Sequence, residues 1–388
     1  MSEINRTPGI KESVILIWGQ IGPYHADRCE ALARYLGSHY RVIGLEIAGA
    51  SDTYAWEKSV DNAFYEKNTL FPNLRYENTT ISMRFSRILK FCLRTGAKHV
   101  FFSAFAPAEF FLIALFLRFL GCRVYAMQDS KFDTKQRFLL RELIKTIFYA
   151  PYHGVLVSGT RTKNYMQFLR LPNEKIFLGC NTVSIERVRT LADSPPAPNG
   201  VPHSERHFTI ISRLVPVKNV ALAIAAYDNY RLLAGVSARD LHICGSGELE
   251  DHLKRDVERR DLSGVIFHGF LPAAGVAKIL ATSLALILPS TAEQWGLVVN
   301  EALAMGVPIL CSDNVGARDS LVRTGVNGYV FEPDNAEGLA YLMHRLAADE
   351  AEWRRFAEAS GRIAMEGDVS RFAEGVACAI GAAGASAG

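Results

Sequence analysis

Short runs of aliphatic residues alternate along this chain with longer stretches in which apolar residues recur at helical spacing. An uninterrupted aliphatic run is typical of a strand buried on both faces of a parallel sheet, and the amphipathic stretches are typical of the helices that cover it. The regular alternation therefore predicts an α/β fold with parallel, doubly wound sheets. Strands are expected at 13–18, 41–46, 99–105, 123–127, 154–157, 207–211, 240–244, 264–268, 284–288 and 308–311.

The alternation breaks once, between residues 194 and 202, where four prolines and a glycine stand in a short polar stretch. Such a stretch is typical of a linker. We therefore expect two Rossmann-like domains, 1–200 and 201–365, that face each other across a cleft. Ligands of doubly wound sheets bind at the carboxyl ends of the strands, so the cleft is the expected site. The last residues, 381–388, have low complexity and are expected to be disordered.

Composition narrows the class of protein. The chain has 388 residues, of which 49% are hydrophobic, enough for two cores of ordinary size. A net charge of +3 gives no reason to expect nucleic-acid binding. The seven cysteines lack the spacing of a disulfide framework or a zinc site, which favours a reducing, cytoplasmic compartment.

Two further stretches bear on the compartment. Residues 1–12 are polar and contain no apolar signal core. Residues 100–120 have the length of a membrane span, but Pro107, Glu109 and Arg118 interrupt them. Because central charges are costly in lipid, a strand followed by a buried helix is the favoured interpretation.

Two glutamates with seven residues between them give the strongest chemical signal in the chain. Glu293 follows a predicted strand and lies in a strand-to-helix loop, whereas Glu301 lies about two turns further on, inside the helix. The intervening backbone brings N–H groups to the start of that helix, at Trp295, Gly296 and Leu297. Anions and sugar hydroxyls can be held at such a helix start.

Two cations lie where another predicted strand passes into a helix. Arg213 and Lys218 follow the strand at 207–211, and a helix is expected over 221–230. A planar guanidinium and a lysine point charge at such a junction can converge on one diphosphate, beside the helix N-terminus. The alternative is a pair of solvated surface cations.

Glycines end the next two predicted strands. Gly245 and Gly247 follow the strand at 240–244, and Gly269 follows the strand at 264–268. Glycine lets a ligand approach the backbone closely, but this is not a complete G-x-G-x-x-G motif. A tight turn between a strand and a helix explains the first two glycines equally well.

In this order and with these gaps, the motifs resemble the large family of retaining, nucleotide-sugar-dependent glycosyltransferases with the GT-B fold and the E-x7-E motif, glycosyl transferases group 1 or family 4. The similarity is specific over 208–335, and in the N-terminal half it concerns mainly the layout of elements. The resemblance implies an acceptor-side domain over 1–200 and a nucleotide-sugar-binding domain over 201–365. A helix at 366–380 would return to the first domain.

The resemblance also implies roles for individual residues. Arg213 and Lys218 would hold the donor diphosphate and stabilise the leaving group. Glu301 would accept hydrogen bonds from the ribose hydroxyls, and Glu293 would hold hydroxyls of the transferred sugar. The other donor contacts would come from the backbone at Gly22, Gly245, Gly269, Trp295, Gly296 and Leu297.

The acceptor side departs from the family pattern. Many members have a histidine near the reacting carbon at a strand end in the N-terminal domain, whereas the strand at 123–127 leads here into Asp129. Asp129 is a candidate acceptor base or sugar contact, and a helix cap is the alternative. His25, in the loop after the first strand, is a second candidate, although a lone loop histidine is more often structural.

The expected chemistry needs no metal and no separate cofactor. The leaving group is a nucleoside diphosphate, and fixed cations and backbone donors aimed at its developing charge supply most of the stabilisation. The stretch 129–133 is not a paired-ligand D-x-D motif. The resemblance implies retention of the anomeric configuration.

Residues 81–150 carry twelve basic and four acidic side chains, a local excess of eight positive charges in a chain whose net charge is +3. A helix is expected at 136–148. A basic surface over residues 84–145 favours peripheral contact with an anionic membrane, and a solvated helix face is the alternative.

These features, read with the resemblance, predict a hexosyltransferase that moves a sugar from a UDP- or GDP-sugar to an acceptor hydroxyl. The resemblance alone implies that the acceptor belongs to surface polysaccharide or glycolipid assembly. The expected location is the cytoplasm, on the inner face of the membrane. One alternative is a nucleotide-sugar epimerase on the same fold, which would need more acid–base residues in the cleft. Another is a catalytically silent partner subunit, which the retained Arg213, Lys218, Glu293 and Glu301 argue against.

Overall fold

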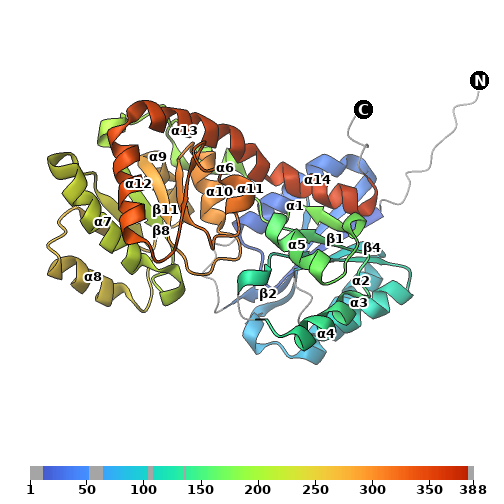
Figure 1. The fold of residues 1–388 in the computed structure, drawn as a ribbon. Coiled ribbons are helices and arrows are strands. Elements are labelled where there is room, and N and C mark those ends of the chain that lie inside the picture. The colour runs from blue at the N-terminus through green and yellow to red at the C-terminus, as the bar shows by residue number, and fades with distance from the viewer. Residues whose placement is uncertain (1–11, 52–63, 104–107, 135–136, 383–388) are drawn as a thin grey trace, which may run out of the picture.

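The structure of the protein is a computed structural model that describes residues 12–51, 64–103, 108–134 and 137–382. Two parallel sheets, each covered by helices on both faces, form two lobes that lie side by side (Figure 1). The predicted α/β architecture with doubly wound sheets is confirmed. The predicted disorder of 381–388 falls almost entirely outside the described residues.

The first sheet has the strand order β3-β2-β1-β4-β5-β6-β7, with all neighbours parallel. Its strands are β1 (Glu12–Trp18), β2 (Tyr40–Ala50), β3 (Glu66–Arg75), β4 (Ala97–Phe102), β5 (Arg123–Gln128), β6 (Gly154–Val157) and β7 (Ile176–Leu178). The helices are α1 (Pro23–Leu36), α2 (Ile81–Arg94), α3 (Ala108–Phe119), α4 (Leu139–Tyr149), α5 (Thr160–Phe168) and the last helix, α14 (Val369–Ile380).

The second sheet has the order β10-β9-β8-β11-β12-β13 and is also parallel throughout. Its strands are β8 (His207–Ile211), β9 (Leu241–Cys244), β10 (Val265–Gly269), β11 (Ser283–Leu288), β12 (Ile309–Ser312) and β13 (Gly328–Phe331). The helices are α6 (Ile185–Ala192), α7 (Val220–Ala234), α8 (Glu250–Arg259), α9 (Ala273–Ala281), α10 (Leu297–Ala304), α11 (Arg318–Leu321), α12 (Ala336–Ala348) and α13 (Glu350–Ile363).

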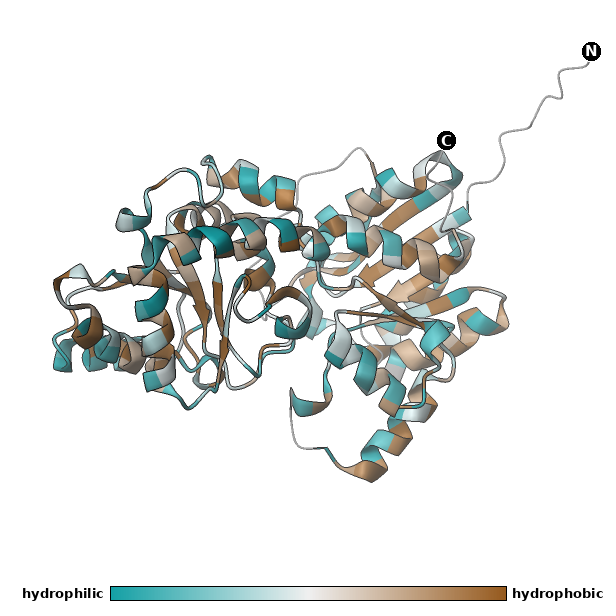
Figure 2. Ribbon diagram, turned by 45° about the horizontal axis from the view of Figure 1, so that its top comes forward, coloured by the Kyte–Doolittle hydropathy of each residue, from teal (hydrophilic) through white to brown (hydrophobic). Residues whose placement is uncertain are grey.

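Both faces of each sheet are buried, as the uninterrupted aliphatic runs predict. In β1, Val14 and Leu16 pack toward α1 and α14, whereas Ile15 and Ile17 pack toward α2 and α3. This alternation follows from the two-residue period of a strand. The strands of both sheets are accordingly among the most hydrophobic parts of the ribbon in Figure 2.

The chain crosses from one lobe to the other earlier than predicted. Val188 of α6 belongs to the core of the second lobe, and the Ala197 N–H donates to the Met305 carbonyl oxygen at 2.8 Å. The proline-rich segment therefore lies against the second lobe, since a segment poor in backbone donors can cover a surface without joining a sheet. The crossing follows β7, well before the boundary placed at residue 200.

The last helix belongs to the first lobe. Phe372 and Val376 of α14 share a hydrophobic core with Cys29 and Leu32 of α1. In Figure 1, α13 runs along the second lobe and α14 continues over the first. The chain thus passes between the lobes twice, which ties them together at the base of the cleft.

Residues 81–150 are less uniformly basic at their surface than the sequence pattern indicates. Arg84 pairs with the buried Glu109 at 2.6 Å, Lys131 donates to the Asn314 carbonyl oxygen at 2.7 Å, and Lys145 pairs with Glu142 at 2.7 Å. Arg137 donates to the Phe132 carbonyl oxygen. Lys135 lies outside the described residues. Within the part of the chain that the structure describes, no helix is long and apolar enough to cross a membrane.

Candidate active site

A cavity of about 960 Å3 lies between the lobes, at the carboxyl ends of both sheets. In the second lobe its walls come from the segments that follow β8 and β11, which are neighbours in the sheet. In the first lobe they come from the loop after β1, from α1, and from the ends of β4, β5 and β7. A cleft at the points where strand order reverses is the usual ligand site of doubly wound sheets.

The loop between the two glutamates ends in a helix start that only glycine accommodates well. Gly296 has φ 97°, and a Cβ there would stand 3.0 Å from a Leu288 side-chain carbon. The α10 helix begins at the next residue, Leu297, so its first N–H groups face the cavity that Trp295, Gly296 and Leu297 line. The Val299 N–H donates to the Gly296 carbonyl oxygen at 2.9 Å, whereas the N–H groups of the two residues before Val299 precede the first bond of the helix and can donate to an anion or a hydroxyl.

Lys218 and Glu293 form an ion pair in the cavity wall. Lys218 ends a single 3-10 turn, Pro216–Lys218, and the next residue, Asn219, anchors that turn by donating to the carbonyl oxygens of Pro289 and Pro333. The Lys218 cation and the Glu293 carboxylate are therefore held side by side. A phosphate would attract the cation, and a sugar hydroxyl would donate to the carboxylate.

Arg213 also lines the cavity but remains exposed. It makes no ion pair with any residue that the structure describes. Its guanidinium therefore needs to break no internal contact to meet an anionic ligand.

Glu301 lies behind the cavity wall, where its carboxylate is buried and accepts a hydrogen bond from the Tyr24 hydroxyl of the first lobe at 2.8 Å. Burial raises the pKa of Glu301, and burial together with the neighbouring Glu301 charge raises the pKa of Tyr24. The hydrogen bond between Glu301, the second glutamate of the motif, and Tyr24 thus links the two lobes. A ribose hydroxyl would join or replace the Tyr24 hydroxyl.

Three of the predicted backbone contacts do not line the cavity. At Gly245 a Cβ would stand 1.8 Å from the Ser212 carbonyl oxygen, so this glycine is needed for packing against the adjacent segment. Gly269 accepts a hydrogen bond from the Gly245 N–H. Gly22 is buried at the start of α1, where its N–H donates to His25 Nδ1 at 3.1 Å. For Gly245 the tight turn is therefore the better interpretation.

His25 lines the cavity but is a poor proton acceptor. Its Nδ1 accepts the Gly22 N–H, which leaves Nε2 as the protonated nitrogen of the neutral ring. Burial and the nearby Arg28 lower its pKa to about 3. The ring also packs on Trp18, with 4.8 Å between centroids. His25 can donate a hydrogen bond to a ligand, but general-base chemistry is disfavoured.

Asp129 lies at the end of β5 and faces the E-x7-E loop across the cavity. Gln294 turns its amide nitrogen toward this carboxylate, at 2.9 Å from Oδ1 and 3.2 Å from Oδ2, an orientation assigned from the acceptors it meets. Burial raises the pKa of Asp129, and a hydrogen bond from Asn181 and the charge of Arg28 offset part of that effect. A carboxylate in this position can accept a proton or a sugar hydroxyl.

Sequence reasoning missed Tyr24, Arg28, Asn181 and Gln294. Arg28 is buried in the cavity wall, and its guanidinium donates twice to the Thr182 carbonyl oxygen, at 2.9 and 3.1 Å. Tyr24 and Arg28 are four residues apart, and so lie on one face of α1. The sequence interpretation placed His25 in a loop after the first strand, which left Tyr24 outside any expected helix and concealed this spacing.

Among the residues that the structure describes, no three His, Cys, Asp or Glu side chains gather in a geometry that could hold a metal ion. The positive charge of the cavity comes from Arg213, Lys218, Arg28 and the α10 N-terminus. The metal-independent mechanism stays a prediction.

The sequence model of the family described as glycosyl transferases group 1 matches residues 194–362. The poly(glycerol-phosphate) alpha-glucosyltransferase of Bacillus subtilis is 33% identical over 295 residues, which are 74% of this chain and 40% of that protein. A glycogen synthase of Mycobacterium tuberculosis is 33% identical over 151 residues, which are 39% of this chain and 36% of that protein. The chain thus spans about two fifths of the length of these curated relatives.

Solved structures resemble the whole chain. Anabaena Alr3699/HepE in complex with UDP superposes with a TM-score of 0.69 at 15% identity, covering 96% of this chain and all of that chain. A sucrose-phosphate synthase from Thermosynechococcus elongatus gives a TM-score of 0.67 at 16% identity, covering 94% of this chain and 96% of that chain. At these identities the superpositions show the fold alone, and support for the family comes from the sequence matches. Residues 194–362 of this chain match the group 1 glycosyltransferases, and the chain as a whole has the GT-B fold.

Proposed function

We propose that this protein transfers a hexose-type sugar from a nucleoside diphosphate sugar to an acceptor hydroxyl, with retention of the anomeric configuration. One observation carries the proposal. Arg213, Lys218, Glu293 and the N–H groups at the start of α10 converge on one cavity, although they follow two different strands. Cations, a carboxylate and free backbone donors in one wall match a ligand that combines a diphosphate with a sugar.

Each group of the second lobe has a role in this proposal. Arg213 and Lys218 hold the diphosphate, and Lys218 moves from Glu293 toward the phosphate when the donor enters. Glu293 is then released to accept hydroxyls of the transferred sugar. Glu301 accepts a ribose hydroxyl beside Tyr24, and the backbone from Trp295 to Leu297 donates to phosphate and sugar oxygens.

In the transfer step, the bond between the anomeric carbon and the leaving diphosphate oxygen breaks while the acceptor oxygen bonds to that carbon. The electron pair of the broken bond stays on the diphosphate, whose charge Arg213, Lys218 and the α10 N-terminus stabilise. The acceptor hydroxyl loses its proton either to the departing phosphate oxygen or to Asp129. These cations supply positive charge at the place where a metal ion would otherwise be needed, so we propose that no metal takes part.

The acceptor that we propose belongs to surface polysaccharide or glycolipid assembly. The relatives include the B. subtilis poly(glycerol-phosphate) alpha-glucosyltransferase and an Escherichia coli O-antigen chain mannosyltransferase B, which is 32% identical over 114 residues. We propose a cytoplasmic location on the inner face of the membrane. All seven cysteines are unpaired and six are buried, which suits a reducing compartment.

A panel of nucleoside diphosphates and nucleotide sugars tests the donor assignment by thermal shift. A true donor should raise the melting temperature, because it binds the folded state alone. The stabilising sugar is then offered with glycan acceptors, and the product anomer is determined by NMR. A retained configuration supports the proposal, an epimerised nucleotide sugar would indicate an epimerase, and binding without any turnover would indicate a silent subunit.

A further inference from the structure

The α4 helix has its polar side toward the protein and its apolar side toward solvent. Leu140, Leu143, Ile144 and Ile147 recur at the spacing of one helix face, yet all four are exposed, Leu140 at 76% and Ile147 at 64%. Glu142, by contrast, is only 4% exposed. A helix that merely covered a core would show the opposite arrangement.

Interactions on the inner side fix this orientation. The Glu142 carboxylate accepts hydrogen bonds from Lys145 at 2.7 Å and from the Tyr165 hydroxyl, and Arg137 stands 3.6 Å away. The Tyr149 hydroxyl accepts a hydrogen bond from Gln128 at the end of β5. Rolling α4 to bury its leucines would leave these buried polar groups without partners, which is costly. The outward apolar stripe is therefore a stable feature.

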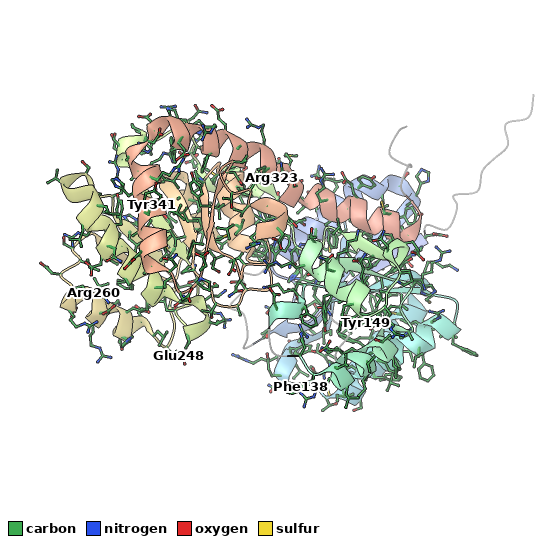
Figure 3. All side chains as sticks on the ribbon, viewed as in Figure 1. Phe138, Tyr149, Glu248, Arg260, Arg323 and Tyr341 are labelled. Carbon is green, nitrogen blue, oxygen red and sulfur yellow. The ribbon has the colours of Figure 1, made fainter. Side chains whose placement is uncertain are left out.

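The apolar face continues onto α3. Phe111 of α3 and Phe148 of α4 pack edge to face at 5.0 Å between ring centroids, which joins the two helices. Leu115, Phe116 and Phe119 of α3 are exposed, Phe119 at 90%. Figure 1 shows α3 and α4 together at the lower edge of the first lobe, and Figure 3 labels Phe138 at that edge, with Tyr149 further inside. A contiguous apolar surface of this kind marks an interaction site.

The charges around this surface are almost all positive. Its exposed cations lie on α3 and α4 and on or beside the neighbouring helix α2, at Arg87, Lys90, Arg94, Lys98, Arg118 and Arg141. The acids of residues 81–150 point elsewhere or are neutralised: Glu109 and Glu142 are buried in ion pairs, Asp129 lines the cavity, and Asp133 pairs with Arg161 at 2.7 Å. A second copy docked on this face would bring like charges together, whereas an anionic lipid surface would attract them.

We propose that the outer faces of α3 and α4, the lipid-contact face, dock on an anionic bilayer. The leucine, isoleucine and phenylalanine side chains enter the boundary between headgroups and acyl chains, and the flanking arginines and lysines meet lipid phosphates. This contact is independent of the transfer reaction, so its failure in an experiment would leave the donor assignment intact.

Flotation of the full chain with lipid vesicles tests the proposal. Three preparations are compared: wild type, a triple variant Leu140→Gln/Ile144→Gln/Ile147→Gln on α4, and a matched triple variant Leu232→Gln/Leu233→Gln/Val236→Gln. The control removes apolar side chains that are at least as exposed, from the C-terminal end of α7 and from the 3-10 turn that follows it in the second lobe. Vesicles of phosphatidylcholine are used with and without phosphatidylglycerol.

Wild type and the α7 variant should float with vesicles that contain phosphatidylglycerol, and the α4 variant should partition at least about tenfold less. Replacing Lys90, Arg94 and Arg141 by glutamine should weaken binding and reduce its salt dependence. Equal flotation of all variants would overturn the proposal. A second result would also overturn it: light scattering shows that wild type is a dimer and the α4 variant a monomer, and neither protein binds vesicles. Unchanged circular dichroism and melting temperature verify that the variants fold.

Discussion

In the second lobe, Arg213, Lys218 and Glu293 reach the cavity from segments that follow two neighbouring strands, β8 and β11. In the first lobe, the polar residues that face them come from a helix and from the ends of separate strands: Tyr24, His25 and Arg28 from α1, Asp129 after β5, and Asn181 after β7. The second lobe thus offers one compact charged wall. The first lobe offers polar side chains from several separate elements, and packing against neighbouring residues removes these side chains from water.

The two cavity walls also differ in how their side chains carry charge. Burial raises the pKa of Asp129 and lowers that of His25, so both groups disfavour their charged forms in the folded protein. Lys218 and Glu293 instead satisfy each other as an ion pair, and Arg213 faces solvent. This contrast favours our proposal that the second lobe binds a charged donor and that the first lobe orders an acceptor and accepts its proton.

The largest effect is expected at Lys218. Lys218→Ala removes a cation from the developing diphosphate and should lower kcat/KM for transfer by about a hundredfold to a thousandfold. Lys254→Ala is the matched control, because Lys254 also pairs with a glutamate, at 2.7 Å from Glu250, but on the exposed face of α8. Initial-rate assays compare kcat/KM of the two variants with that of wild type. Equal rates in both variants would show that the cavity cation has no special role.

Asp129→Asn should separate transfer from donor binding. Transfer should fall about a hundredfold if Asp129 accepts the acceptor proton, while calorimetry should give an unchanged affinity for the nucleoside diphosphate. Because the pKa of Asp129 is raised in the folded state, its stabilising contribution exists only at low pH and is lost as pH rises through that pKa.

The same variant should therefore gain stability at neutral pH, by about 1 kcal/mol, and lose that gain near pH 3. Denaturant titrations at the two pH values measure the difference. A variant that transfers at the wild-type rate would remove Asp129 from the mechanism.

Glu301→Gln keeps the shape of the side chain and removes its charge. The carboxylate is the stronger acceptor for a ribose hydroxyl, so donor affinity should fall about tenfold. The paired variant Tyr24→Phe removes the other half of the contact between the lobes and should cost about 1–3 kcal/mol of unfolding free energy, since it leaves a buried carboxylate without its donor. Undiminished donor affinity in Glu301→Gln would contradict the ribose assignment.

The last prediction concerns acid stability rather than activity. With a folded-state pKa of about 3, His25 stays neutral in the folded protein while the unfolded chain takes up a proton near pH 6.5. Its contribution to stability is therefore present above pH 6.5 and is lost as pH falls toward 3. His25→Gln should be relatively more stable than wild type at pH 4 than at pH 7, by about 3 kcal/mol. Parallel pH profiles of the two proteins would mean that His25 is solvated.

The second lobe is also the part that the sequence predicts best. Glu293 follows the aliphatic strand β11, and Arg213 and Lys218 follow β8. Parallel strands bring their carboxyl ends to one edge of the sheet. Gly245 shows the limit of this reasoning, because a glycine that admits a ligand and a glycine that admits the Ser212 backbone look alike in a sequence.

The first lobe could be predicted only in outline. The strands β3 and β7 were missed because they are sheet edges with weaker aliphatic runs, and β13, at an edge of the second sheet, was missed likewise. Arg28 and Tyr24 line the cavity because α1 packs beside it, and the local sequence does not indicate where a helix packs. The inverted α4 helix was predicted as a helix at 136–148 within a basic surface, but a sequence pattern does not say which side of a helix faces the core.

One calorimetric comparison tests the division of labour between the lobes most directly. The donor identified by thermal shift is titrated into wild type, into Arg213→Ala/Lys218→Ala, and into His25→Gln/Asp129→Asn. The account predicts that the second-lobe pair loses at least about a hundredfold in donor affinity, whereas the first-lobe pair binds the donor like wild type and fails in transfer. Donor affinity that falls with the first-lobe pair, or survives in the second-lobe pair, would contradict it.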